Sequence, residues 1–183
     1  MSKNGKPEIF FSSTLKSPAG SALFAKLVEP DVFQGGDPTW KITLVFNESD
    51  PEFIEFRKVV DDFAAKYSKE CGKKVEPDSV FRPDRNTGQP SITFKSKARQ
   101  DEVGNYERIP IVDANKTPTD KEPWNGDVCR VAFRFGGWKS AFGVGIKPYL
   151  SAVQVLERNR GGGSKFNAVN VFDGGSSEVE TPF

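Results

Sequence analysis

The sequence predicts a mostly β protein, a small antiparallel β-barrel with one capping α-helix and a flexible C-terminal tail. Three observations predict this class. Apolar and polar residues alternate over five or six segments, only one segment has helical periodicity, and no helix separates consecutive strands as a βαβ unit requires. The length of 183 residues favours a single compact domain.

The first strands are expected before residue 47. Ile9, Phe10 and Phe11 interrupt a polar N-terminal stretch and are typical of a short edge strand. From Ser21 the pattern alternates, with one face formed by Leu23, Ala25 and Leu27 and the other by Ala22, Phe24, Lys26 and Val28. After a turn at 35–38, a second strand places on one face Trp40, Ile42, Leu44 and Phe46. Trp40 is therefore expected in the core.

One amphipathic helix is expected over about residues 50–71. Asn47 to Glu52 supply a capping side chain, a proline for the first turn and an early acidic residue. Six residues then recur at three- and four-residue spacing, namely Phe53, Phe56, Val60, Phe63, Ala64 and Tyr67. Gly72 is a typical helix end. We expect the aromatic stripe of this helix to cover the core.

The second half of the chain is expected to return to strands. Residues 91–99 alternate and lead through a turn at 102–105 into 106–112 as a hairpin. A long loop at 113–126, a strand at 127–135, a connection at 136–139 and a long last strand at 142–157 follow. These elements favour the OB-fold for a domain of residues 1–160. Residues 161–183 are interpreted as a glycine-rich linker and tail.

The composition argues against catalysis and metal binding. The chain has no histidine, which removes Ser-His and Cys-His nucleophilic sites and the usual zinc and iron sites. Its two cysteines, Cys71 and Cys129, lack metal-ligand spacing and are interpreted as reduced, packed thiols. No carboxylates cluster, so we expect neither an enzyme nor a cofactor. Without an apolar run of about 18 residues or a signal sequence, a cytoplasmic location is expected.

Charge is distributed unevenly along the chain. The net charge is +1, but residues 173–183 contain three acidic and no basic residues. The rest of the chain therefore holds 26 basic and 22 acidic residues, a net charge of +4. A mildly basic body with an acidic tail favours an anionic partner for the body.

Basic residues repeat on the polar faces of three expected strands. Lys95, Lys97 and Arg99 share one face, Arg130 and Arg134 share another, and Lys147 shares a third with Tyr149. Trp138 lies beside Lys139 in the glycine-flanked connection. The candidate binding residues are therefore Lys95, Lys97, Arg99, Tyr106, Arg130, Arg134, Trp138, Lys139, Lys147 and Tyr149. The alternative is that these outer faces are basic only because they are exposed to solvent, without a binding function.

This mixture of cations and rings fits single-stranded DNA. Phosphates require positive charge, and unstacked bases stack on exposed rings. A protein that reads duplex DNA would more often show a basic recognition helix, whereas the expected helix has a mixed-charge face. The sequence therefore predicts a single-strand binding protein rather than a duplex reader.

The tail suggests a second binding function. It is acidic, follows a glycine linker and ends with Pro182 and Phe183; Glu178 and Glu180 precede them. A partner pocket that takes the terminal ring, with basic residues around it for the carboxylates, would explain this ending. The alternative is a frayed terminus without a role.

At these residues the chain resembles the single-stranded DNA-binding proteins of tailed bacteriophages. The similarity is strongest over 126–163, in Arg130 to Phe133, Trp138-Lys139, Val144-Gly145, Val153 to Glu157 and Gly161 to Gly163. Pro182-Phe183 after acidic residues also resembles the partner-docking terminus of bacterial single-stranded DNA-binding proteins. The resemblance implies an OB-fold, sequence-tolerant binding, a role in phage replication and recombination, and location in the host cytoplasm.

Other functions are compatible with the same sequence. A nucleic-acid-processing enzyme such as a nuclease would need clustered carboxylates for Mg²⁺, and none stands out. A phage structural or adaptor protein could use the barrel only for protein contacts. A homodimer is compatible with the sequence, which does not specify an oligomeric state.

Overall fold

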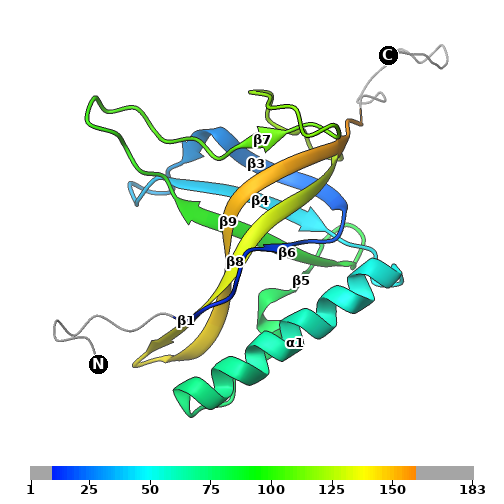
Figure 1. Cartoon of the computed structure of the whole chain (residues 1–183), viewed down its shortest axis with the longest axis vertical. Coiled ribbons are helices and arrows are strands. Elements are labelled where there is room, and N and C mark those ends of the chain that lie inside the picture. The colour runs from blue at the N-terminus through cyan, green and yellow to red at the C-terminus, as the bar shows by residue number, and fades with distance from the viewer. Residues whose placement is uncertain (1–9, 160–183) are drawn as a thin grey trace.

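Five long strands close into a ring in the computed structural model, which describes residues 10–159 (Figure 1). They are β3 (Gly20–Asp31), β4 (Thr39–Val45), β6 (Pro90–Lys97), β8 (Val128–Ser140) and β9 (Gly143–Glu157). Hydrogen-bonded pairing runs from β3 to β4, β6, β9 and β8, and from β8 back to β3. We call this arrangement the strand ring.

Four short strands extend the ring to nine strands in this part of the chain. β1 (Phe10–Phe11) and β2 (Leu15–Lys16) pair with β8, β5 (Arg82–Pro83) pairs with β6, and β7 (Ile111–Val112) pairs with β9. The expected edge strand at Phe10 and Phe11 is confirmed; Ile9 and the tail at 161–183 lie outside the described residues.

The expectation of a purely antiparallel sheet is wrong at two places. β6 and β9 are parallel, and so are β7 and β9. The first exception follows from counting: directions cannot alternate around a closed ring of five strands, so at least one neighbouring pair must be parallel. The remaining pairings of the ring are antiparallel.

The expected helix is confirmed as α1 (Pro51–Cys71). The Asp50 side chain accepts a hydrogen bond from the Glu52 amide, and Gly72 ends the helix in the left-handed region with φ 74°. The buried residues of α1 are those of the expected stripe: Phe53, Phe56, Val60, Phe63, Ala64 and Tyr67. α1 lies along one end of the strand ring (Figure 1), followed by a 3₁₀ turn, η1 (Pro77–Val80).

Aromatic side chains join α1 to the interior of the ring. Phe133 and Phe135 are fully buried with ring centroids 4.8 Å apart, and Phe63 of α1 stacks on Phe135 at 5.4 Å. Trp40 is also buried, and its indole N–H donates to the carbonyl of Glu107 at 3.0 Å. The expectation that Trp40 belongs to the core is confirmed.

The expected alternation in β3 is wrong because the strand contains a β-bulge. Leu23 pairs with Thr43, and Lys26 pairs with Lys41. Between these two pairs β3 therefore contains one residue more than β4. The residues directly after the bulge therefore change face, and a second register shift follows between Lys26 and Asp31. Ala22 and Leu27 are both buried, and Phe24 and Lys26 are exposed.

Two expected elements of the second half are also corrected. The hairpin of 91–99 with 106–112 is reduced to one bridge, Gln100 with Tyr106, because Ile111 and Val112 pair instead with β9. The expected connection at 136–139 is part of β8, which pairs with β9 up to Ser140 and Gly143. Trp138 therefore lies in a strand, not in a loop.

Candidate nucleic-acid interface

The register of the ring places one outward residue from each long strand in a single row. Lys26 is opposite Lys41, Lys41 is opposite Lys95, Lys95 is opposite Tyr149, and Tyr149 is opposite Arg134. We call these five residues the basic row. Lys26, Lys95 and Arg134 are exposed, and Lys41 and Tyr149 are half-buried. Four cations and one aromatic ring thus cross five neighbouring strands.

Aromatic contacts hold the β8 end of the basic row in place. The Arg134 guanidinium lies 4.6 Å from the centre of the Phe11 ring and donates to the Ser12 carbonyl at 3.0 Å. Phe11 contacts Tyr149 edge-on at 5.8 Å. A Cβ at Gly136 would come within 2.5 Å of the Tyr149 ring, so only glycine leaves room for the ring there. Cation and ring are therefore held at fixed positions.

The β8–β9 hairpin carries a second ring and cation beside the row. Trp138 lies over Gly145, where a Cβ would come within 2.7 Å of the indole. The Lys147 ammonium lies 5.8 Å from the centre of the same ring. Trp138 is half-buried, Lys147 is exposed, and Phe142 at the hairpin tip is fully exposed.

Two carboxylates, Asp31 at the end of β3 and Asp37 in the β3–β4 turn, are paired with lysines of this face. Lys41 forms an ion pair with Asp31 at 2.7 Å, and Lys97 forms one with Asp37 at 3.2 Å. The hydrogen bond from Lys41 lowers the pKa of the Asp31 carboxyl. The end of β3 and the turn are thereby tied to β4 and β6 by two ion pairs, one half-buried and one exposed, for which an anionic ligand would compete.

Three of the sequence-predicted residues lie apart from the basic row. Lys139 faces the other side of β8 and donates to the Cys71 carbonyl at 3.1 Å, at the end of α1. Arg130 is ion-paired with Glu52 at 2.7 Å, at the start of α1. Tyr106 is half-buried, edge-on to Trp40 at 6.2 Å.

The other seven predicted residues lie in the basic row, along β6 or along the β8–β9 hairpin. Lys95, Arg134 and Tyr149 belong to the basic row itself. Lys97 is exposed two residues further along β6, on the same side as Lys95, and Arg99 is exposed just beyond the end of β6. Trp138 and Lys147 lie along the hairpin.

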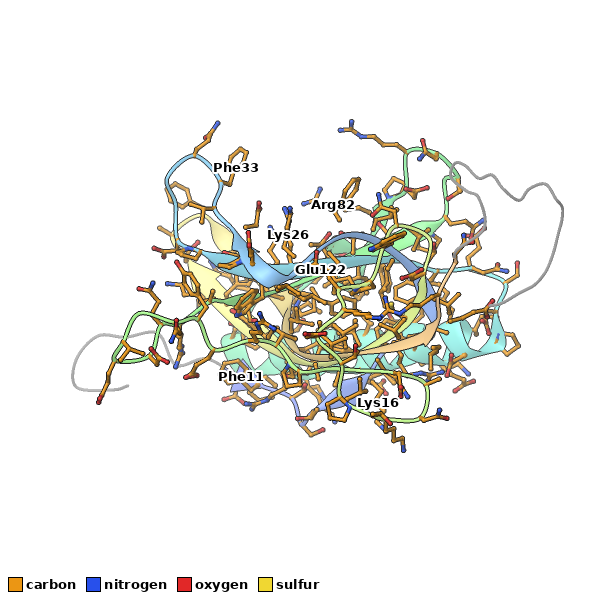
Figure 2. The ribbon with its side chains drawn as sticks, turned by 90° about the horizontal axis from the view of Figure 1, so that it is seen from above. Phe11, Lys16, Lys26, Phe33, Arg82 and Glu122 are labelled. Atoms are coloured by element: carbon orange, nitrogen blue, oxygen red, sulfur yellow. The ribbon has the colours of Figure 1, made fainter. Side chains whose placement is uncertain are left out.

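Sequence reasoning missed several exposed rings near this surface. Phe24 is 63% exposed, Phe33 71% and Trp124 65%. In Figure 2, Phe33, Lys26 and Arg82 point to one side of the molecule, and Phe11 and Lys16 point to the opposite side. Phe33 precedes Gln34-Gly35-Gly36. Its exposure could have been predicted from this position next to a glycine turn. Phe24 gave no such signal, because the bulge that turns it outward is not visible in the pattern.

Over residues 10–159 no group of three or more His, Cys, Asp or Glu side chains lies close enough to hold a metal ion. Both cysteines are free thiols, and burial raises the pKa of Cys129 to about 12. In the same part of the chain, no helix is long and apolar enough to span a membrane.

Solved structures share this fold, although no family model and no curated protein sequence matches the chain. Gp2.5, a single-stranded DNA-binding protein encoded by bacteriophage T7, superimposes with a TM-score of 0.66 at 16% identity, over 86% of this chain and 98% of that one. The single-stranded DNA-binding protein of bacteriophage Enc34, in complex with single-stranded DNA, gives 0.62 at 16% identity, over 80% and 88%. The chain therefore has the fold of bacteriophage single-stranded DNA-binding proteins, as its resemblance to them implied.

Proposed function

We propose that this protein binds single-stranded DNA with little sequence preference, on the outer surface of a strand ring that is an OB-fold barrel, and catalyses no covalent reaction. The observation that carries the proposal is the basic row, in which register alone aligns four cations and Tyr149 across five strands. The fold shared with phage proteins that bind single-stranded DNA supports it.

The chemistry of the surface matches an unpaired strand. The lysines and arginines neutralise phosphates. The rings of Tyr149 and Trp138 offer surfaces on which any of the four bases can stack. A flexible single strand can follow the curved surface of the ring, whereas a duplex is too stiff to do so. Because the contacts are to phosphates and base faces, little sequence preference is expected.

The ten sequence-predicted residues are proposed to contribute unequally. Lys95, Lys97, Arg99, Arg134, Trp138, Lys147 and Tyr149 contact DNA directly. Lys139 and Arg130 hold the two ends of α1, and Tyr106 covers Trp40, so these three act mainly by supporting the surface.

A direct test compares single-stranded with duplex DNA. Fluorescence anisotropy with labelled oligo-dT and with a duplex of equal length should show clearly tighter binding of oligo-dT. Equal affinities would contradict the proposal. Hydrolysis of the labelled strand after addition of Mg²⁺ would instead favour a nuclease, the rival function that composition left open.

We further propose that the protein protects single strands during phage replication and recombination, in the host cytoplasm, and recruits partner proteins through its tail. The domain of residues 1–160 would bind DNA and residues 161–183 would bind partners, with Glu178, Glu180, Pro182 and Phe183 as the anchor. An aromatic anchor usually dominates a small interface. In pull-downs from infected cells, Phe183→Ala should lose partners that the full chain retains; equal capture would contradict the tail proposal while leaving DNA binding untouched.

A further inference from the structure

The β-bulge in β3 gives Phe24 an unusual conformation. Phe24 has φ 53°, in the left-handed region that bulky residues avoid, and its ring is largely exposed. The bulge is what turns Phe24 and then Lys26 away from the core. A strained backbone that directs an aromatic ring into solvent is a feature that stability alone does not explain.

The loop at 113–126 holds the bulge, and the second register shift of β3 between Lys26 and Asp31, with side-chain hydrogen bonds. One carboxylate oxygen of Glu122 accepts from the amides of Leu27 at 2.5 Å and Val28 at 2.9 Å. The Asn125 side-chain oxygen accepts from the Phe24 amide at 2.9 Å. These bonds satisfy amides that the two register shifts remove from the sheet ladder. Trp124 lies between Glu122 and Asn125 in the chain and lines the same hollow as Phe24.

An open hollow of about 630 Å³ lies between the bulge and this loop. Phe24 and Trp124 line it with Lys26 and Lys41, the first two residues of the basic row. Lys41 is paired with Asp31, whereas Lys26 has no ion-pair partner among residues 10–159. Glu122 also lines the hollow, but its carboxylate is already engaged by two backbone amides.

We propose that this hollow is a nucleotide subsite at the β3 end of the basic row: a base of bound single-stranded DNA packs against Phe24 and Trp124, and its phosphate contacts Lys26. This inference rests on the proposed function. A nucleotide fits better than an apolar peptide because two lysines line the hollow and because Lys26 and Lys41 continue directly into the DNA surface. The DNA path then covers all five strands of the ring rather than β4, β6 and the hairpin alone.

The test uses full-length protein and a saturating length of oligo-dT. Phe24→Ala should weaken binding roughly 5- to 150-fold, the range for loss of one stacked base, without changing the salt dependence. Lys26→Gln should weaken binding and reduce the slope of log affinity against log salt by about 0.7, the loss of one phosphate contact on a single strand. Ile54→Ala, which removes an exposed apolar side chain from α1, should bind oligo-dT with the affinity and the salt dependence of the wild type.

Trp124 provides a readout of its own. If a base contacts it, Trp124→Phe should keep most of the affinity, because a ring remains, and should remove a large part of the tryptophan quenching that DNA causes. Thermal unfolding of each variant shows whether the fold is intact; the mutated side chains are exposed, so melting temperatures close to wild type are expected.

The outcomes separate this inference from the proposed function. If the wild type does not bind oligo-dT, the proposed function fails. If the wild type binds and Phe24→Ala and Lys26→Gln bind equally well, only the subsite is overturned. If Phe24→Ala leaves DNA affinity unchanged and abolishes capture of a partner protein, the hollow is a protein-docking site and the subsite is likewise overturned.

Discussion

Lys139 and Lys147 lie on the same hairpin, but their surroundings give them different roles. Lys139 points toward α1 and donates to the Cys71 carbonyl at the helix C-terminus, where a cation is favourable. Lys147 points outward beside the Trp138 ring. Successive residues of each strand face opposite sides of the hairpin. By this alternation Lys139 lies on the face toward α1, and Lys147 lies on the outer face.

Replacing an outer ring should reduce DNA affinity without unfolding the protein. Trp138→Ala and Tyr149→Ala should each weaken oligo-dT binding by roughly 1–3 kcal/mol, the contribution of one stacked base. Each ring is half-buried and packs over a glycine at the surface, so its removal should lower the melting temperature only modestly. Fluorescence titration and thermal unfolding measure the two effects. Lys139→Ala is the matched control; if it weakens binding more than Trp138→Ala does, the faces of the hairpin are assigned the wrong way round.

Side-chain orientation was predictable from sequence wherever alternation is unbroken. The buried faces of β4 and α1 and the exposed positions of Lys95 and Lys97 follow the pattern. In β3 one extra residue before Lys26 inverts the positions that follow it, and nothing in the local pattern marks where this residue lies. Phe24 and Lys26 were therefore not recognised as a pair at the surface.

At the scale of elements, glycines join α1 to the hairpin. Gly137 faces Tyr67, and a Cβ there would lie less than 3.0 Å from the Tyr67 ring, which is itself buried. Gly136, on the other face, receives Tyr149 in the same way. These glycines resemble a turn in the sequence, but each makes room for a ring, so the strand continues through them.

Gly137→Ala should therefore push α1 away from β8. Overpacking of a well-packed contact costs roughly 1–3 kcal/mol, which urea unfolding would measure. Adding Tyr67→Ala removes the clashing ring, so the penalty of Gly137→Ala should be much smaller in the Tyr67→Ala background than in the wild type. Independent, additive effects in this double-mutant cycle would show that the two residues do not contact each other.

The start of α1 should make stability depend on acid pH. Burial would raise the pKa of Glu52, but hydrogen bonds from Arg130 and the Ala19 amide outweigh it and lower that pKa. A carboxyl with a lower pKa in the folded state stabilises the fold above its unfolded pKa of about 4.3 and loses this contribution as pH falls through the folded value.

Glu52→Gln should accordingly reduce stability at pH 7 and flatten its decline below about pH 5, where the wild-type carboxylate becomes protonated. Urea unfolding at several pH values measures this. Arg130→Gln removes the same ion pair from the other side and should flatten the profile in a similar way. An unchanged pH profile in both variants would mean that the pair does not contribute to stability.

Element boundaries were predictable where local chemistry determines them. The helix was expected at about 50–71 and occupies Pro51–Cys71, because its cap, its period and Gly72 all lie in the local sequence. The partner of Ile111–Val112 was not predictable, because its parallel pairing with β9 joins segments far apart in the chain. Local alternation identifies a strand but not the strand it pairs with.

At the scale of the whole molecule, ring closure assembles the site. The predicted residues come from segments as distant as Lys95 and Tyr149, and only the register of neighbouring strands aligns them. Sequence patterns could predict that each strand has a basic outer face. They could not predict that Lys26 and Lys41 join the row, or that Arg130 and Lys139 lie apart from it, because these depend on a bulge and on the position of α1.

The salt dependence of oligo-dT binding tests the central claim most directly. Tryptophan fluorescence titrations over a salt series should show log affinity falling linearly with log salt, by about 0.7 for each phosphate contacted. Lys95→Gln, at the centre of the basic row, should lower the slope by about that amount, whereas Lys69→Gln on exposed α1 should leave it unchanged. An affinity that does not respond to salt, or a slope that Lys95→Gln leaves intact, would contradict the assignment of the basic row as the DNA-binding surface.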